Sequence, residues 1–428
     1  MAIKTKRFIA SRKSCSCSMP GVWRAVAYCE GVVVIFHSPR ACAHVARSMD
    51  INAQYRAYAE GRREQEGTVP LLSSQLEEKH SIFGGAERLE ACLDYALQEY
   101  KPQCLVIANS CVAGVIGDDV EAVARKKEAQ YGVPVLQLDC CGFLDGEYYQ
   151  GYYGMSELLI KRFFKPAPKE AGSVLLLGDN GGPWGHYATE VTRLLQELQV
   201  KVIGQFPGYM PFKALPRATS AEAVIILGGR GQSHEGLSKI ASLLKEGFGM
   251  PYLDQYPVGW QRTQAWLVAV GKLLQREELA AKALLQEKQH FDAALAKYLP
   301  VTKGKRVVLC IGRLLKYFHP ESVLETIRLL QLDLTGIILL DAYDKAEREK
   351  MLQVLAPAMQ TKIYSAAAGE PLLEAADLVL TTHELQNESI KQIFLPMLPK
   401  VGTTGELEFM ELIYRRLASR IKGGLSYV

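Results

Sequence analysis

Residues 104–139 read CLVIANSCVAGVIGDDVEAVARKKEAQYGVPVLQLD and contain the pattern on which the fold assignment rests. Two short apolar runs, 104–109 and 134–139, have the composition of buried strands. Between them, Asp118 or Asp119 is a suitable N-cap for a helix, and Gly132 is suited to follow its end. A strand, a helix and a second strand in this order are typical of an α/β protein with a parallel sheet.

The same alternation continues on both sides of this segment. A chain of 428 residues is too long for one core, because domains average about 150 residues. Two prolines among lysines at 163–172 indicate a linker. We therefore predict three Rossmann-like α/β domains with parallel sheets, at 1–165, 170–300 and 303–428. Further strands are expected at 31–36, 173–178, 201–206, 223–229, 304–312, 335–341 and 376–382, a long helical region at 261–299, and a docking helix at 405–422.

Composition excludes several classes of protein. Hydrophobic residues make up 48% of the chain and charged residues 22%, as in globular proteins. The net charge of +4 is small for this length, so we expect neither a nucleic-acid partner nor a membrane partner. The start MAIKTKRFIASRK is basic but lacks the apolar segment of a secretory signal, and no apolar run approaches the ~20 residues of a membrane span. We expect a cytoplasmic protein.

Ten cysteines are unusual for such a protein. Because the cytoplasm keeps thiols reduced, they predict a metal or redox site rather than a disulfide framework. Cys104 and Cys310 lie inside apolar strand patterns and are expected to pack as small hydrophobic residues. Cys42 and Cys111 each follow a predicted strand, where α/β sheets bind ligands. Cys17 lies 25 residues before Cys42 with one helix between them, so the three thiols are expected to converge.

An iron–sulfur cluster is the preferred occupant of such a site, because thiolates are soft ligands and cubane clusters usually take four of them. Three cysteines leave one position open. Cys15, Cys29, a residue of another subunit, or a cluster shared across an interface can fill it. Zinc is the alternative occupant, although the chain has no CxxC pair. Three unrelated loop cysteines remain the third interpretation.

Two longer stretches, 17–47 and 109–143, resemble the component 1 subunits of nitrogenase and their relatives, which include cofactor-scaffold proteins. That family has a first cysteine, then H-G-P-x-G-C, then C-x-x-x-x-I-G-D-D. This chain has Cys17, then His37-Ser38-Pro39-Arg40-Ala41-Cys42, then Cys111 followed by Ile116-Gly117-Asp118-Asp119. Weaker likeness covers nearly the whole chain, and the family also has three α/β units.

The resemblance implies that Cys17, Cys42 and Cys111 hold a 4Fe–4S cluster, or a larger cluster, at the interface with a second component 1-like subunit. It also implies an oxidoreductase that relays electrons from an ATP-dependent iron protein to a substrate or a metallocofactor. The chain has no P-loop lysine motif, so we expect it to bind no nucleotide. His37 and Arg40 border Cys42 and are either residues that tune the cluster or an ordinary loop histidine and surface arginine.

The chain also departs from the family. The catalytic α subunit anchors its iron–molybdenum cofactor with a cysteine in the second domain and a histidine in the third. Here Gly228 and Gly229 stand where the thiol is expected, His234 is displaced from that position, and 395–406 contains no histidine. The departures imply a β-type partner subunit, a scaffold-type protein or a divergent nitrogenase-like group rather than nitrogen fixation.

Other segments are weaker candidates. The loops 178–187 and 228–236, the second with Arg230 and His234, either bind an anion or form tight turns. The pair Cys140 and Cys141 is either an additional ligand pair or a packed turn, and the tyrosines of 147–154 lie at an interface, over a pocket or in the core. Three functions follow from these observations: an electron-transferring reductase subunit, a scaffold for metallocofactor assembly, and a cluster-free metabolite-binding α/β protein.

Overall fold

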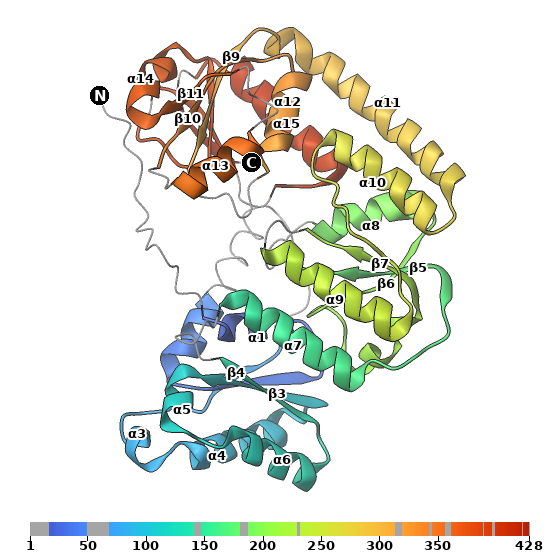
Figure 1. Cartoon of the computed structure of the whole chain (residues 1–428), viewed down its shortest axis with the longest axis vertical. Coiled ribbons are helices and arrows are strands. Elements are labelled where there is room, and N and C mark those ends of the chain that lie inside the picture. The colour runs from blue at the N-terminus through green and yellow to red at the C-terminus, as the bar shows by residue number, and fades with distance from the viewer. Residues whose placement is uncertain are drawn as a thin grey trace.

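Three parallel sheets follow one another along the chain (Figure 1). The structure is a computed structural model, and it describes residues 17–48, 68–140, 147–179, 187–228, 232–312, 319–341, 345–355, 361–387, 389–395, 399–421 and 423–427. Every strand pair in these residues is parallel. The predicted fold class, α/β with three parallel sheets, is therefore confirmed.

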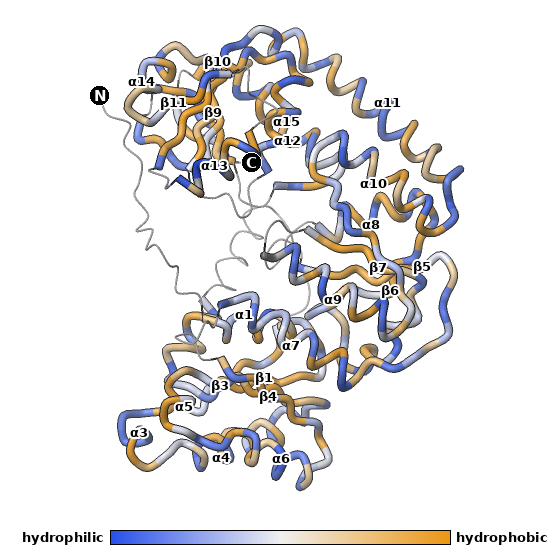
Figure 2. The backbone as a smooth tube through the Cα atoms, in the orientation of Figure 1, coloured by the Kyte–Doolittle hydropathy of each residue, from blue (hydrophilic) through white to orange (hydrophobic). Residues whose placement is uncertain are grey.

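The first sheet has the strand order β2-β1-β3-β4. Its alternating side chains serve two cores: Val33 and Ile35 pack with helices α4 and α6, and Val34 and Phe36 pack on the side of α1 and α7. The strands appear as largely hydrophobic segments in Figure 2. The elements are α1 (Met19–Arg24), β1 (Val32–His37), a helix over 40–48, β2 (Leu71–Ser73), α3 (His80–Phe83), α4 (Ala86–Tyr100), β3 (Cys104–Ser110), α5 (Cys111–Ile116), α6 (Val120–Tyr131) and β4 (Val135–Cys140).

The second sheet has the order β6-β5-β7-β8. Helix α7 contacts α1 and β4 of the first unit and α9 of the second, so one hydrophobic core is continuous across both units. The elements are α7 (Tyr148–Phe163), β5 (Glu170–Leu177), α8 (Tyr187–Glu197), β6 (Lys201–Phe206), the 3-10 helix η1 (Phe212–Ser220), β7 (Ala221–Ile226), α9 (Gln232–Phe248), β8 (Tyr252–Leu253) and α10 (Trp260–Leu273).

The third sheet has the order β11-β10-β9-β12-β13-β14. The long helix α11 packs against α10, α8 and α15 and so joins the second and third units (Figure 1). The elements are α11 (Glu277–Thr302), β9 (Arg306–Ile311), α12 (Pro320–Leu329), β10 (Asp333–Leu339), α13 (Lys345–Val354), β11 (Ile363–Ser365), α14 (Ala366–Ala375), β12 (Leu378–Thr381), β13 (Lys391–Phe394), α15 (Gly402–Ala418) and β14 (Gly424–Tyr427).

Most elements lie close to their predicted positions. The helix expected near 117–132 is α6, with the Asp119 carboxylate capping its start and Gly132 (φ 68°) following its end. The region 261–299 is two helices rather than one, because the chain turns between α10 and α11 at Gln275, whose φ is 53°. The domain limits 1–165, 170–300 and 303–428 stay a prediction. In the described residues, no helix combines the length and the apolar character that crossing a bilayer requires.

Helices α1 and α7 approach each other backbone to backbone. A Cβ atom on Gly21 would lie 2.8 Å from the Tyr152 backbone nitrogen, and one on Gly151 would lie 2.8 Å from the Ser18 carbonyl carbon. Any larger residue would separate the two helices. This contact fixes the start of α1, and with it the position of the neighbouring Cys17.

Candidate functional site

Cys42 and Cys111 lie beyond the carboxyl ends of two adjacent strands. Strands β1 and β3 pair in parallel up to His37 and Asn109. Cys42 is in the first turn of the helix 40–48, and Cys111 is the first residue of α5. The Ser110 hydroxyl accepts a hydrogen bond from the Ala113 backbone N–H at 3.3 Å and so fixes the start of α5. The two sequence-predicted thiols are thus at the same edge of the sheet.

The two thiols are half-buried and close enough to influence each other. Burial raises the pKa of Cys42, a hydrogen bond with Ser38 opposes that rise, and the Cys111 thiol adds to it. Cys42 is therefore protonated at neutral pH unless a positive charge is nearby. A metal ion is such a charge, and it deprotonates a coordinating thiol.

Cys17 is also half-buried, just before Ser18 and the start of α1. It packs against the same hydrophobic core as Cys42. Among the described residues, no group of three or more His, Cys, Asp or Glu side chains can hold a single metal ion. The thiolates of a polynuclear cluster bind different iron atoms and stand further apart than the ligands of one ion.

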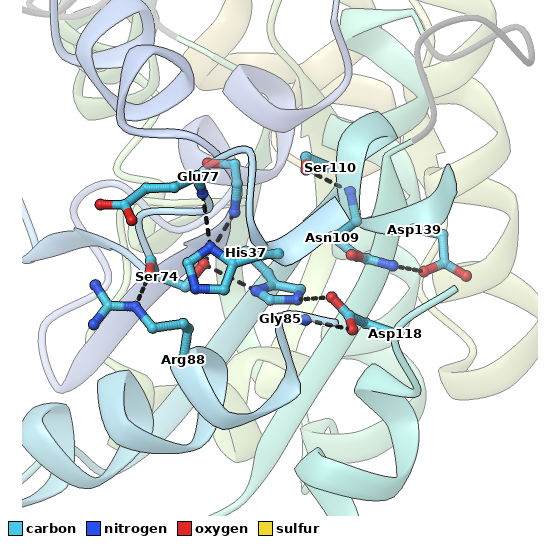
Figure 3. Close-up of polar contacts among 12 residues, drawn as sticks. His37, Ser74, Glu77, Gly85, Arg88, Asn109, Ser110, Asp118 and Asp139 are labelled. Atoms are coloured by element: carbon cyan, nitrogen blue, oxygen red, sulfur yellow. Dashed lines mark hydrogen bonds and ion pairs between the residues drawn. The ribbon is translucent and has the colours of Figure 1, made fainter. Parts of the chain in front are cut away.

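A buried histidine–aspartate pair joins the two cysteine-bearing segments (Figure 3). His37 Nε2 lies 3.0 Å from Asp118 Oδ2, and His37 Nδ1 lies 2.9 Å from Ser74 Oγ. Ser74 Oγ also accepts a hydrogen bond from the Ser38 N–H at 3.2 Å, so its own proton is free to be donated to Nδ1. The imidazole consequently carries its proton on Nε2 and donates it to Asp118. Burial lowers the pKa of His37, against the raising effect of Asp118, and so favours this neutral form.

The two adjacent carboxylates of the IGDD motif have separate structural tasks. Asp118 accepts from His37 and, through Oδ1, from the Gly85 N–H at 2.8 Å, directly before α4. Asp119 caps α6 by accepting from the Ala122 N–H at 2.9 Å. The sequence left the choice of cap open and did not reveal the Asp118 task. The signal was present, since only one of two adjacent carboxylates can cap a single helix.

The two residues that border Cys42 differ in their exposure to solvent. His37 is not a loop residue: it ends β1 and is fully buried, whereas Arg40 is exposed.

The other cysteines are mostly buried. Cys29 is buried in the core, which raises its pKa to about 12. Cys140 is buried at the end of β4. Cys15 and Cys141 lie outside the described residues. Cys104 and Cys310 are fully buried in β3 and β9, as predicted.

The second unit contributes an ion pair that the sequence did not predict. Arg24 of α1 donates to both Asp179 carboxylate oxygens, at 2.9 and 2.8 Å, directly after β5. Asp179 also accepts from the Tyr209 hydroxyl at 2.6 Å, and Arg24 is buried. The rest of the loop, 180–186, lies outside the described residues.

The other two candidate segments have ordinary surroundings. In the predicted loop 228–236, residues 232–236 instead belong to α9, where His234 pairs with Asp254 at 2.9 Å; Arg230 lies outside the described residues. The tyrosines of 147–154 begin α7, where Tyr152 is buried in the core shared by the first two units. Tyr152 therefore has the core role that the sequence allowed.

The chain is similar in sequence to proteins of the nitrogenase system. The chain is 28% identical over 307 residues to the nitrogenase molybdenum-iron protein alpha chain of Acidithiobacillus ferridurans, covering 68% of this chain and 59% of the relative. It is 27% identical over 305 residues to the nitrogenase iron-molybdenum cofactor biosynthesis protein NifE of Clostridium pasteurianum, covering 68% of this chain and 63% of the relative. The chain thus spans about three-fifths of the length of these relatives.

A solved structure and a family match extend this likeness over most of the chain. The structure of nitrogenase Cp1 at pH 5 superimposes with a TM-score of 0.65 over 98% of this chain and 91% of that one, at 15% identity, which shows the shared fold. Residues 17–392 match the family of nitrogenase component 1 type oxidoreductases, a range that includes Cys17, Cys42 and Cys111. The chain belongs to the nitrogenase component 1 type oxidoreductase family.

Proposed function

We propose that this chain binds an iron–sulfur cluster, 4Fe–4S or larger, through Cys17, Cys42 and Cys111. In this proposal it serves as one subunit of a nitrogenase-like reductase. The observation that carries the proposal is the proximity of Cys42 and Cys111 at the ends of the adjacent strands β1 and β3. Thiolates are the ligands that iron–sulfur clusters take, and the carboxyl edge of a parallel sheet is where α/β proteins bind ligands.

The thiol donors at this edge of the sheet are of the type that iron–sulfur clusters take. Burial raises the pKa of the half-buried Cys42, so its thiol would give up its proton only on binding a metal ion. The His37–Asp118 pair ties the end of β1 to the turn before α6, on either side of the two cysteine-bearing helices. A site held by buried hydrogen bonds keeps its ligands in place without the metal.

When bound, the cluster supplies a centre that accepts and donates single electrons. The chain's own residues set the conditions for this. The Cys42 and Cys111 thiols lose their protons on binding, and the Ser38 hydroxyl is placed to hydrogen-bond the Cys42 sulfur. His37 is neutral and hydrogen-bonded at both ring nitrogens. It therefore holds the end of β1 in place and adds no charge beside Cys42.

Exposed apolar side chains on α3 and on α5, the helix that begins at Cys111, support a role for partner proteins. Ile82 and Phe83 of α3 are 77% and 84% exposed, and Val115 of α5 is 73% exposed. Helices α3 and α5 contact each other, so these residues belong to one region of the surface. Apolar residues gathered this way are a feature of protein interfaces. We assign the region to a second component 1-like subunit; an ATP-dependent iron protein is the proposed electron donor.

A second candidate function is assembly of a metallocofactor. It is favoured by the 27% identity to a NifE protein, whose name describes cofactor biosynthesis. Both functions need the same cluster. They differ in turnover: a reductase consumes reduced iron protein with a small substrate, whereas a scaffold releases a metallocofactor to another protein.

Iron and acid-labile sulfide content of anaerobically purified protein tests the proposal. We expect about four iron atoms or more per cluster in the wild type, and loss of most of them in Cys42→Ser and Cys111→Ser. Cys92→Ser is the matched control, because Cys92 is also half-buried but lies on α4. Iron-free wild-type protein would favour the cluster-free metabolite-binding alternative, and equal iron in the wild type and all variants would show that Cys42 and Cys111 do not hold it.

A further inference from the structure

A cavity of about 480 Å³ opens on the first unit, apart from the two cysteines. It lies between the helix 40–48, the edge strand β2 and helix α4. Four basic side chains line it: Arg40, His44, Arg47 and Arg88. The three arginines come from two helices that are separated in sequence by β2, so the fold itself gathers their charge.

Among the described lining residues none is acidic. The described ion pairs include none of the three arginines. Glu77 is influenced by the Arg88 charge, but it pairs with Lys79 at 2.9 Å and does not line the cavity. Burial raises the pKa of the lining thiol Cys92 to about 11, so that thiol is uncharged at neutral pH. The cavity therefore carries positive charge, and no described acidic residue lines it.

The lining also has an apolar part and one oriented guanidinium. Leu71 and Leu72 of β2 and Ala91 of α4 contribute the apolar surface. The Arg88 Nε–H donates to the Ser74 carbonyl oxygen at 3.3 Å (Figure 3). That bond uses one of the five guanidinium N–H donors and leaves the other four for a ligand.

We propose that this cavity binds a small organic anion whose carboxylate or phosphate groups pair with Arg40, Arg47 and Arg88. The apolar part of the ligand lies against Leu71 and Leu72. Arginine suits this role because its planar fork binds carboxylate and phosphate groups through two parallel hydrogen bonds. The volume falls within the range of about 300–1,000 Å³ that is usual for small-molecule sites. The proposal does not depend on the cluster.

Isothermal titration calorimetry on the full chain tests the site with three probes of one shape. 1-Naphthyl phosphate and 1-naphthoate carry the two candidate anionic groups, and 1-naphthol carries none. We expect at least one anion to bind at submillimolar concentration and 1-naphthol to bind at least tenfold more weakly. Comparing the two anions identifies the preferred group. Absence of binding by both anions at millimolar concentration, or equal binding of 1-naphthol, overturns the proposal.

Variants separate the site from general surface charge. Arg40→Gln/Arg47→Gln should weaken anion binding at least tenfold; both side chains are exposed, and neither makes a hydrogen bond or ion pair within the described part of the chain, so folding should be retained. Arg88→Gln is an independent second variant. The control Arg125→Gln/Lys201→Gln removes the same charge from the exposed side chains of α6 and β6. Equal weakening by this control contradicts a specific site.

Discussion

His37 Nε2 and Asp118 Oδ2 lie 3.0 Å apart, and this buried contact joins the two sequence segments that carry Cys42 and Cys111 (Figure 3). His37 is the last residue of β1, five positions before Cys42. Asp118 follows α5, whose first residue is Cys111. The pair therefore fixes the relative position of the two thiols before any metal is bound.

Asp118→Asn should destabilise the chain. Two N–H donors, from His37 and Gly85, point at the two Asp118 oxygens, and an asparagine offers only one acceptor. A buried donor without a partner lowers the free energy of unfolding by about 1–3 kcal/mol. Urea unfolding monitored by circular dichroism measures the change.

The matched control is the neighbouring Asp119→Asn. Asp119 accepts one bond, from the Ala122 N–H at 2.9 Å, and an asparagine oxygen caps a helix about as well. Its unfolding free energy should stay within about 0.5 kcal/mol of the wild type. Equal losses in the two variants would contradict the role assigned to Asp118.

Gly85→Ala should disturb the same contact by steric overlap. A Cβ atom at residue 85 would lie 2.7 Å from Asp118 Oδ2 and 3.1 Å from His37 Cε1, both in the interior. Overpacking of this kind lowers the unfolding free energy by about 1–3 kcal/mol. Gly247→Ala in α9 is the control, because nothing lies within 4 Å of its added Cβ and alanine favours the helix. Thermal unfolding of both variants should show opposite shifts; a shift of the same sign and size contradicts the argument.

Stability should depend on pH through His37. Burial lowers the pKa of His37 below its ordinary value of 6.5, so the unfolded chain binds a proton more readily than the folded chain. The contribution is present above pH 6.5 and is lost as the pH falls below that value toward the folded-state pKa. For one proton the slope reaches about 1.4 kcal/mol per pH unit.

His37→Gln isolates this effect. The glutamine amide can still donate to Asp118 but does not titrate. Between pH 7 and pH 5, the wild type should lose more unfolding free energy than His37→Gln, measured by urea unfolding at each pH. Parallel curves for the two proteins would show that His37 does not carry the dependence.

The partly buried Arg24–Asp179 pair should couple the first two units. Replacing one member, as in Arg24→Gln or Asp179→Asn, removes one charge of the pair and should lower the unfolding free energy by about 3 kcal/mol. The double variant should lose less than the sum of the two, with a coupling of at least about 1 kcal/mol. The exposed pair Lys201–Glu170 at 2.7 Å is the control and should show coupling below about 1 kcal/mol. Additive losses at Arg24 and Asp179 would show that the two side chains are not energetically coupled.

The sequence predicted the strands that are continuous apolar runs and the helices that have recognisable capping residues. Strands β1, β3 and β9 are continuous apolar runs, and α6 has a cap at Asp119 and a glycine at 132. Short edge strands such as β2, β11 and β14 were not predicted, because three or four residues contain too little pattern to distinguish a strand from a loop. Their pairing depends on the neighbouring strand rather than on their own composition.

The sequence predicted those candidate site residues whose place in the fold follows from their position directly after a strand. Cys42 and Cys111 each follow an apolar strand, so their common edge was visible in the sequence. The contact between His37 and Asp118 joins residues 81 positions apart, and that between Arg24 and Asp179 joins residues 155 apart. Neither spacing has a periodicity that a sequence can reveal. The basic cavity is also invisible in the sequence, because its arginines meet only through the packing of the helix 40–48 against β2 and α4.

Anomalous diffraction at the iron absorption edge, from crystals grown anaerobically, tests directly whether Cys42 and Cys111 bind iron. We expect a strong iron peak bonded to the sulfurs of Cys42 and Cys111, with Cys17 on the same group of iron atoms. Crystals of iron-loaded protein whose iron peak lies elsewhere, with the sulfurs of Cys42 and Cys111 free of metal, would contradict this expectation.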